Sequence, residues 1–132
     1  MQTIFDGETL LAIVYRNEDW VDGLNFFTPN DIFLQAGSWQ YPKGKKLDSH
    51  RHKIYQRTAN RTQELVYVKQ GRLKVFLFDD QKRPKQEFLL SQGDSAVLVN
   101  GGHGYEILED NTQILEVKNG PFLDVESDKE KF

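Results

Sequence analysis

The chain contains three histidines, and together with one glutamate they form the group of residues best suited to chemistry. His50 and His52 are two residues apart, so on a β-strand their side chains would point to the same face. Two imidazoles on one face can share a metal ion. Glu64 opens the next apolar segment, and His103 follows a Gly-Asp turn and a further strand-like segment. Three imidazoles and one carboxylate suit one divalent transition metal (Fe, Mn, Ni or Zn) and leave positions open for water, oxygen or substrate.

Short strands are expected to position these side chains, because the apolar patterns are brief, often alternating and rich in β-formers. The predicted strands span residues 11–15, 31–41, 64–69, 73–78, 86–90, 95–99, 104–108 and 113–117. Gly71 is placed as in a tight hairpin turn, and residues 79–84 predict a longer turn. No segment has a sustained period near 3.6 residues. The pattern therefore predicts an all-β sandwich or barrel.

Length and composition limit the classes of protein that fit. The 132 residues suit one domain, with a core at about residues 30–122, an N-terminal arm at 1–29 and a charged, frayed tail at 124–132. The formal charge of −3 argues against a nucleic-acid partner, and the lack of cysteine excludes disulfides and thiolate chemistry. No segment has the pattern of a membrane span or a secretory signal, so we expect a cytoplasmic protein with no membrane partner.

The spacing around the first two histidines resembles the first motif of the cupin superfamily. Five residues separate Gly44 from His50, and six residues separate Glu64 from Gly71. Both glycine spacings match the family. The spacer of eleven residues between His52 and Glu64 is longer than the three or four residues usual in cupins.

The second cupin motif is matched around the third histidine. Gly93 and Asp94 are followed by a short strand, a glycine-rich turn and His103. Val99 stands where the family usually has proline, the turn is one residue shorter, and Ile107 stands where asparagine is usual. The resemblance covers about residues 35–120.

The resemblance to cupins implies a fold and a site. It implies a single-domain double-stranded β-helix, or jelly-roll barrel, that binds a small molecule and forms a homodimer. Position by position, it assigns His50, His52, Glu64 and His103 as metal ligands. An N-terminal segment such as residues 2–15 is a candidate for dimer contacts across a two-fold axis.

Strand alternation suggests which other side chains surround this site. Tyr105 shares a face with His103, and Val66 and Val68 share one with Glu64. Tyr41 and Tyr105 are candidate catalytic acids. On the same early strand as Tyr41, Gln35 is a candidate polar contact and Trp39 a candidate stacking wall for a substrate, although the aromatic residues there fit a core or a dimer surface equally well.

Charged residues near the histidines suggest what a ligand would carry. Arg57 and Arg61 lie in the long spacer and are candidate substrate-binding residues, because a guanidinium binds carboxylate or phosphate through two donors. A solvated loop is the simpler interpretation of the same charges. Glu116 and Lys118 share a face of the last strand, as a buried polar pair or as an exposed edge pair.

Three functions remain open at this point. The first is a metal-dependent enzyme acting on a small, anionic molecule, with the ion as Lewis acid or oxygen-binding centre. The second is a metal-independent sugar-nucleotide isomerase or epimerase of cupin fold, linked to surface-polysaccharide synthesis, with a histidine as base and a tyrosine as acid. The third is a non-catalytic small-molecule binding module.

Overall fold

The computed structural model describes all 132 residues, and nearly all of its regular structure is β-strand. The strands are β1 (Gln2–Asp6), β2 (Thr9–Tyr15), β3 (Gly23–Phe26), β4 (Gly37–Gln40), β5 (Glu64–Gln70), β6 (Arg72–Phe78), β7 (Pro84–Ser91), β8 (Ser95–Leu98), β9 (Gly102–Ile107) and β10 (Gln113–Lys118). A single 3-10 turn, η1, spans Asn17–Asp19, and one short helix, α1, spans Val125–Asp128. The predicted all-β class is confirmed.

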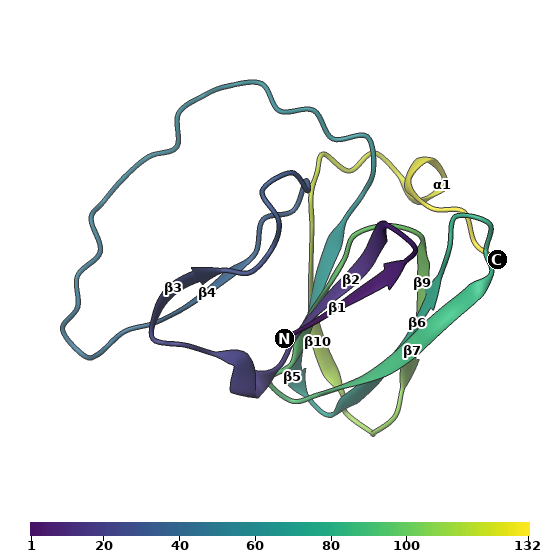
Figure 1. Cartoon of the computed structure of the whole chain (residues 1–132), viewed down its shortest axis with the longest axis horizontal. Helices are drawn as coiled ribbons and strands as arrows, with labels where there is room; N and C mark the ends of the chain where they lie inside the picture. Colours follow the sequence, from purple (N-terminus) through teal and green to yellow (C-terminus); the bar gives the residue numbers. More distant parts are fainter.

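The strands form three antiparallel sheets (Figure 1). A five-stranded sheet has the order β1-β2-β8-β5-β10, a three-stranded sheet has the order β7-β6-β9, and β3 pairs with β4 as a separate ribbon. No strand hydrogen-bonds across from the five-stranded to the three-stranded sheet, so the ladders do not close into a single barrel.

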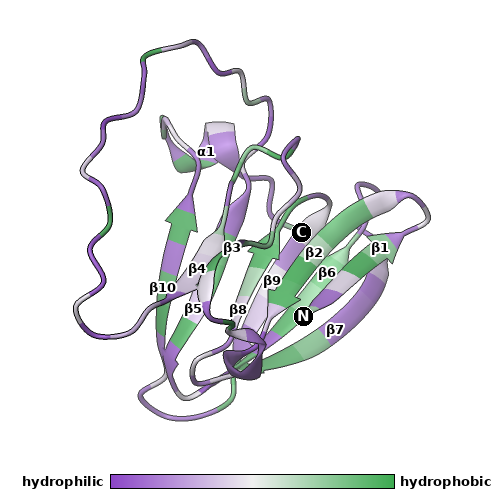
Figure 2. Ribbon diagram, turned by 60° about the vertical axis from the view of Figure 1, so that its left-hand side comes forward, coloured by the Kyte–Doolittle hydropathy of each residue, from purple (hydrophilic) through white to green (hydrophobic).

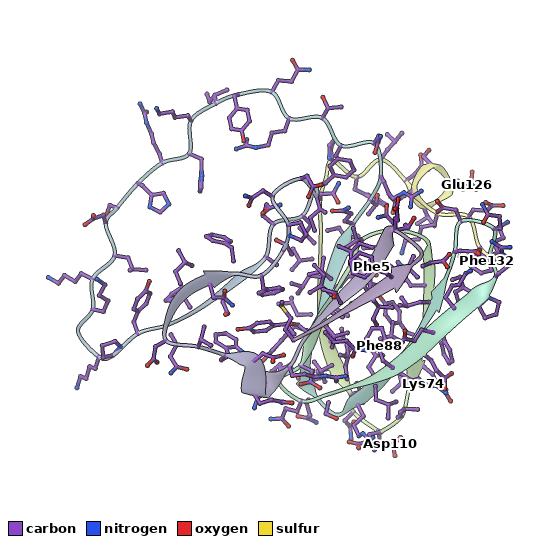
Figure 3. All side chains as sticks on the ribbon, in the orientation of Figure 1. Phe5, Lys74, Phe88, Asp110, Glu126 and Phe132 are labelled. Atoms are coloured by element: carbon purple, nitrogen blue, oxygen red, sulfur yellow. The ribbon has the colours of Figure 1, made fainter.

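The core lies between the two larger sheets. Residues of β5 and β6 alternate between buried and part-exposed, as expected for strands with one face turned inward. The inward side chains of both sheets form one apolar cluster, which includes Val66 and Val68 from β5, Val75 from β6 and Phe88 from β7. This packing holds the inner faces of the two sheets against each other, and Figure 3 shows Phe88 within it.

The outer face of the five-stranded sheet is also covered. Ile13, Val97 and Val99 form a second apolar cluster there with Ala36. The ring of Phe27, in the loop after β3, stacks on Tyr15 with centroids 4.2 Å apart. All four residues of β8 are buried as a result, which explains its continuous apolar sequence rather than an alternating one.

Several predicted elements differ from the observed ones. The strand predicted at 31–41 is present only at Gly37–Gln40, because the preceding residues form a loop over the second cluster. β1 and β3 were not predicted. The hairpin predicted at Gly71 is wrong, since β5 pairs with β8 and β10 whereas β6 pairs with β7 and β9. Gly71, at φ 83°, carries the chain from one sheet to the other. The turn predicted at 79–84 does join a paired hairpin, β6–β7.

The ends of the chain are tied into the fold. The N-terminal arm expected at residues 1–29 contributes β1 and β2 to the five-stranded sheet, with residues 11–15 buried. The outer edge of β1 carries no further strand, and the dimer contact through residues 2–15 stays a prediction. At the other end, residues 124–132, here called the strap, were expected to fray. They instead contain α1 and run back over the sheets (Figure 1).

Residues 41–63 join β4 to β5 and contain no helix or strand. We call this segment the β4–β5 loop. Figure 1 shows it as a wide arc that leaves the ribbon of β3 and β4 and returns at the start of β5. None of the helices is long and apolar enough to cross a membrane.

Candidate functional site

Glu64 is a buried carboxylate at the first position of β5. It points inward together with Val66 and Val68, as strand alternation predicted. In the register between β5 and β10, Lys118 lies directly opposite Glu64. The Lys118 Nζ atom is 3.1 Å from Glu64 Oε2 and 2.9 Å from Glu116 Oε1. Since β10 is the edge strand, Glu116 is exposed and Lys118 is half-buried, the two residues of β10 form an edge pair, one of the two alternatives that the sequence left open, and Lys118 also reaches the buried Glu64.

His103 and Tyr105 approach Glu64 from the opposite sheet. Both lie on β9, where His103 pairs with Leu77 and Tyr105 with Val75, two inward residues of β6. The His103 Nε2 atom is 2.8 Å from Glu64 Oε1, and the Tyr105 hydroxyl donates a hydrogen bond to the same oxygen. The two rings have centroids 5.3 Å apart. Side chains from both sheets thus converge on one carboxylate.

The charge state of this cluster follows from its contacts. Burial by itself would raise the pKa of the Glu64 carboxyl, because it disfavours the charged form. The hydrogen bonds from His103 and Tyr105 and the nearby Lys118 ammonium outweigh burial and lower the Glu64 pKa from 4.5 to about 2. Glu64 is therefore ionised at neutral pH and acts as an acceptor only.

Tyr105 and Lys118, which both contact Glu64, keep their protons at neutral pH. Burial and the hydrogen bond to the Glu64 carboxylate raise the pKa of the Tyr105 phenol far above its usual value. Burial works against the charge on Lys118, but its contacts with Glu116 and Glu64 raise the Lys118 pKa above its usual value. The cluster thus combines one carboxylate, one ammonium and one phenol that holds its proton.

Glu64, His103 and Tyr105 open into a cleft of about 930 Å³ between the sheets. Its walls combine aromatic side chains, glycine backbone and polar groups. They include Phe76, Phe78, Asn100, Gly101, Gly102, Gly104, Arg61, Thr62 and Asp80. A cleft of this size can take a molecule of several hundred daltons. Arg61, near the rim, contacts Asn100 Oδ1 at 3.2 Å and Asp80 Oδ1 at 3.1 Å.

The strap lines one side of the cleft with its last five residues. The ring of Phe132 packs edge-on against Phe78, with centroids 5.1 Å apart, and Figure 3 shows it at the end of β6 and β7. A Cβ atom on Gly102 would come within 2.9 Å of the Phe132 ring, so this close packing depends on a glycine. The side chains of Thr62 and Asp128 are hydrogen-bonded to each other, which ties the strap to the start of β5. The strap therefore partly covers the polar cluster.

The structure brings together only some of the predicted site residues. Glu64, His103, Tyr105 and Arg61 all line the cleft. Glu64 and Tyr105 lie on strands predicted at their positions, whereas His103 stands one residue before the predicted strand and Arg61 lies in the β4–β5 loop. The facing of β5 and β9 places Glu64, His103 and Tyr105 in one space.

His50 and His52 lie elsewhere. They are exposed in the β4–β5 loop, not on a strand, with ring centroids 5.4 Å apart. The strand geometry that motivated their pairing is therefore not observed. His50 Nδ1 contacts the carbonyl oxygen of Asp48 at 3.1 Å, within the same loop.

The remaining candidates also lie outside the cleft. Tyr41 and Trp39 line a shallow hollow on the ribbon of β3 and β4. The Gln35 amide donates hydrogen bonds to the carbonyls of Pro29 and Ile32 and so holds its own loop. The Arg57 guanidinium stacks over the Tyr55 ring at 3.6 Å, in the β4–β5 loop.

The cupin resemblance implies a metal, so we asked whether the gathered residues fit one. Glu64 and His103 supply two ligand groups, but no cluster of three or more His, Cys, Asp or Glu side chains is assembled anywhere in the chain. Lys118 occupies the other carboxylate oxygen of Glu64. The four-ligand set is therefore not formed in this conformation, and a metal at His50, His52, Glu64 and His103 stays a prediction.

Two residues near the polar cluster were not assigned to the site from the sequence. Lys118 was considered only with Glu116, and the missing information was the register that places it opposite Glu64. Phe132 belongs to a charged tail without periodicity, so no sequence pattern indicated its packing on Phe78.

No family model, curated protein or solved structure matches this chain.

Proposed function

We propose that this chain is an enzyme of cupin-like, jelly-roll fold that moves protons on a small polar molecule in the cleft between its sheets. The observation that carries the proposal is the convergence of Glu64, His103 and Tyr105 from two sheets within this cleft. The two facing antiparallel sheets agree with such a fold, and the spacing of the cupin motifs supports it.

His103 is the proposed base. Since Glu64 is ionised and can only accept, His103 Nε2 carries the hydrogen of their contact, which leaves Nδ1 with a free lone pair. When Nδ1 takes a proton from substrate, the Glu64 carboxylate stabilises the imidazolium that forms. This is the role of the acidic member in a catalytic triad.

Tyr105 is the proposed acid. Its phenol retains its proton over the whole physiological range, because burial and Glu64 both oppose ionisation. Turned from Glu64 to a carbonyl oxygen of the substrate, it can pass its proton to that oxygen while His103 removes a proton from the neighbouring hydroxyl-bearing carbon, which gives an enediol. His103 then returns its proton to the former carbonyl carbon while the second hydroxyl gives its proton back to Tyr105, and the isomerisation is complete. The cleft volume of about 930 Å³ accommodates a sugar nucleotide, and Arg61 at its rim suits a phosphate.

The test is exchange of substrate hydrogen with solvent. Keto-sugar nucleotides are incubated in deuterated water with chelator-treated protein, and mass spectrometry follows deuterium gain. We expect exchange with the wild-type protein and loss of it in His103→Gln and Tyr105→Phe. His50→Gln and Tyr41→Phe are matched controls outside the cleft and should keep full activity. Exchange that survives in His103→Gln would rule out the assigned base.

A metal-dependent reaction is the second candidate, and one observation favours it. Residues 48–60 of the β4–β5 loop make no hydrogen bond outside that loop, and eleven residues separate His52 from Glu64. Eleven residues can span about 35 Å, which is long enough for this loop to fold over the cleft. His50 and His52 would then join Glu64 and His103.

Metal analysis distinguishes the two candidates. The metal candidate predicts near-stoichiometric transition metal after reconstitution, lost in a His50→Ala, His52→Ala double variant. Metal content that is negligible after reconstitution, or that survives this double substitution, contradicts that ligand set.

A further inference from the structure

Positive charge is concentrated in the β4–β5 loop. This segment contains seven Lys or Arg and a single acidic residue, Asp48. The rest of the chain holds the other ten Lys or Arg against nineteen Asp or Glu. The net charge of −3 is therefore the sum of a strongly basic β4–β5 loop and an acidic remainder of the chain. The sequence-based argument against a nucleic-acid partner used the total charge, whereas local charge determines what a surface attracts.

The same loop exposes apolar side chains among its basic ones. Ile54 is fully exposed, and Leu47 and Tyr55 are more than half exposed. In Figure 2 the loop is mostly hydrophilic, with isolated hydrophobic positions, and in Figure 3 its side chains project from both sides of the wide arc. Exposed aliphatic residues interspersed with lysine and arginine are typical of segments that lie in a membrane interface.

An aromatic surface adjoins the base of the loop. Trp20, Trp39 and Tyr41 line a shallow hollow of about 550 Å³ together with Lys45 and Leu47. The two tryptophans are 44% and 58% exposed, which is unusual for side chains of this size. Tryptophan and tyrosine are enriched where a membrane meets water, because one part of each ring system is apolar and another forms hydrogen bonds.

We propose that the β4–β5 loop and this aromatic hollow form a docking surface for an anionic lipid bilayer. Lys and Arg side chains are attracted to acidic headgroups, while Leu47, Ile54 and the tryptophans enter the interfacial region. The aliphatic side chains favour a bilayer over a nucleic acid, since nucleobases offer stacking partners for aromatic rings but none for Ile54. The protein would lie on the membrane, with Arg61 connecting the docking loop to the rim of the cleft.

Co-sedimentation with vesicles tests the proposal. The 132-residue protein is mixed with vesicles of phosphatidylcholine alone, or of phosphatidylcholine with phosphatidylserine, at low and high salt. We expect binding to the anionic vesicles only, weakened by salt as screening increases. Lys45→Gln with Lys46→Gln should weaken partitioning by roughly tenfold or more. The matched control, Lys69→Gln with Arg72→Gln, removes two exposed charges near the β5–β6 turn and should bind as wild type.

A second variant addresses the apolar part of the surface. Leu47→Ser with Ile54→Ser keeps every charge and sits in a segment without regular structure, so it should not disturb the fold. We expect it to reduce binding to the anionic vesicles severalfold and to increase its salt sensitivity. Equal binding to both vesicle types, or equal losses in the loop and control charge variants, would overturn the proposal. So would binding to a single-stranded oligonucleotide, lost in the loop variants, without any binding to vesicles.

Discussion

Glu64→Gln tests whether the polar cluster exists in solution as described. The substitution keeps the shape of the side chain but removes the charge that His103, Tyr105 and Lys118 surround. The contacts lower the Glu64 pKa from 4.5 to about 2. Since one pKa unit corresponds to about 1.4 kcal/mol, the ionised carboxylate contributes about 3 kcal/mol to the free energy of unfolding near neutral pH.

The sign of the pH dependence follows from the direction of this shift. A carboxyl whose pKa is lower in the folded state stabilises the protein above the unfolded value, and that stabilisation is lost as pH falls toward the folded value. The stability difference between wild type and Glu64→Gln should thus be largest above about pH 5 and should mostly disappear by about pH 2. The pKa values of Asp19 and Asp79 are also lowered, but both residues are present in either protein, so their effect cancels in the difference.

Denaturant titration monitored by tryptophan fluorescence, on chelator-treated protein at a series of pH values, measures this difference. Glu87→Gln is the matched control, because Glu87 is an exposed carboxylate that contacts only Lys74, at 2.8 Å. Exposed pairs of this kind contribute little, so this variant should unfold much like wild type. A Glu64→Gln difference that is the same at every pH, or no larger than that of the control, would refute the description of the cluster.

Three further predictions concern the strap, the backbone and the loop. Phe132→Ala should cause a severalfold increase in the rate at which diethylpyrocarbonate modifies His103. Mass spectrometry measures this rate, with the two loop histidines as internal references, and an unchanged rate would contradict the covering role of the strap. Gly101→Ala should lower the free energy of unfolding by several kcal/mol, since its φ is 74° and a Cβ would lie 2.1 Å from the Phe78 carbonyl oxygen. In the same denaturant titration, Gly44→Ala should cost only about 1 kcal/mol, because its φ is 90° but no atom stands near the added Cβ. Limited trypsin digestion should first cut within the β4–β5 loop, because this loop is the most accessible segment of the chain. Early cuts between β5 and β10 would contradict this prediction.

The alternating segments were the predictable part of the fold. In β5 and β6, short runs rich in β-formers identified the strands, and strand alternation placed Val66 and Val68 correctly on the inward face with Glu64. β3 was missed because this four-residue strand has no fully buried side chain. The pairing of β5 with β8 and β10 depends on residues distant in sequence. Local turn chemistry at Gly71 therefore predicted a hairpin that is absent.

The candidate site was predicted only in part, because contacts between distant segments are not determined by the local sequence. Glu64 begins a strand that the sequence predicted and His103 directly precedes another, and the contact between them follows once the two sheets face each other. His50 and His52 were assigned by spacing alone. Their segment is polar without any buried position, so nothing in its local sequence favours a strand. The packing of Phe132 from the strap on Phe78 is likewise a contact between distant segments, which no local sequence pattern indicates.

In the proposed function, ligand binding and chemistry depend on the cleft and not on the loop histidines. The most direct test compares His103→Gln with His50→Gln, using a nucleotide sugar that raises the melting temperature of the wild-type protein. The account predicts that the shift is lost in His103→Gln and kept in His50→Gln. A shift that persists in His103→Gln, or that disappears in His50→Gln, would contradict it.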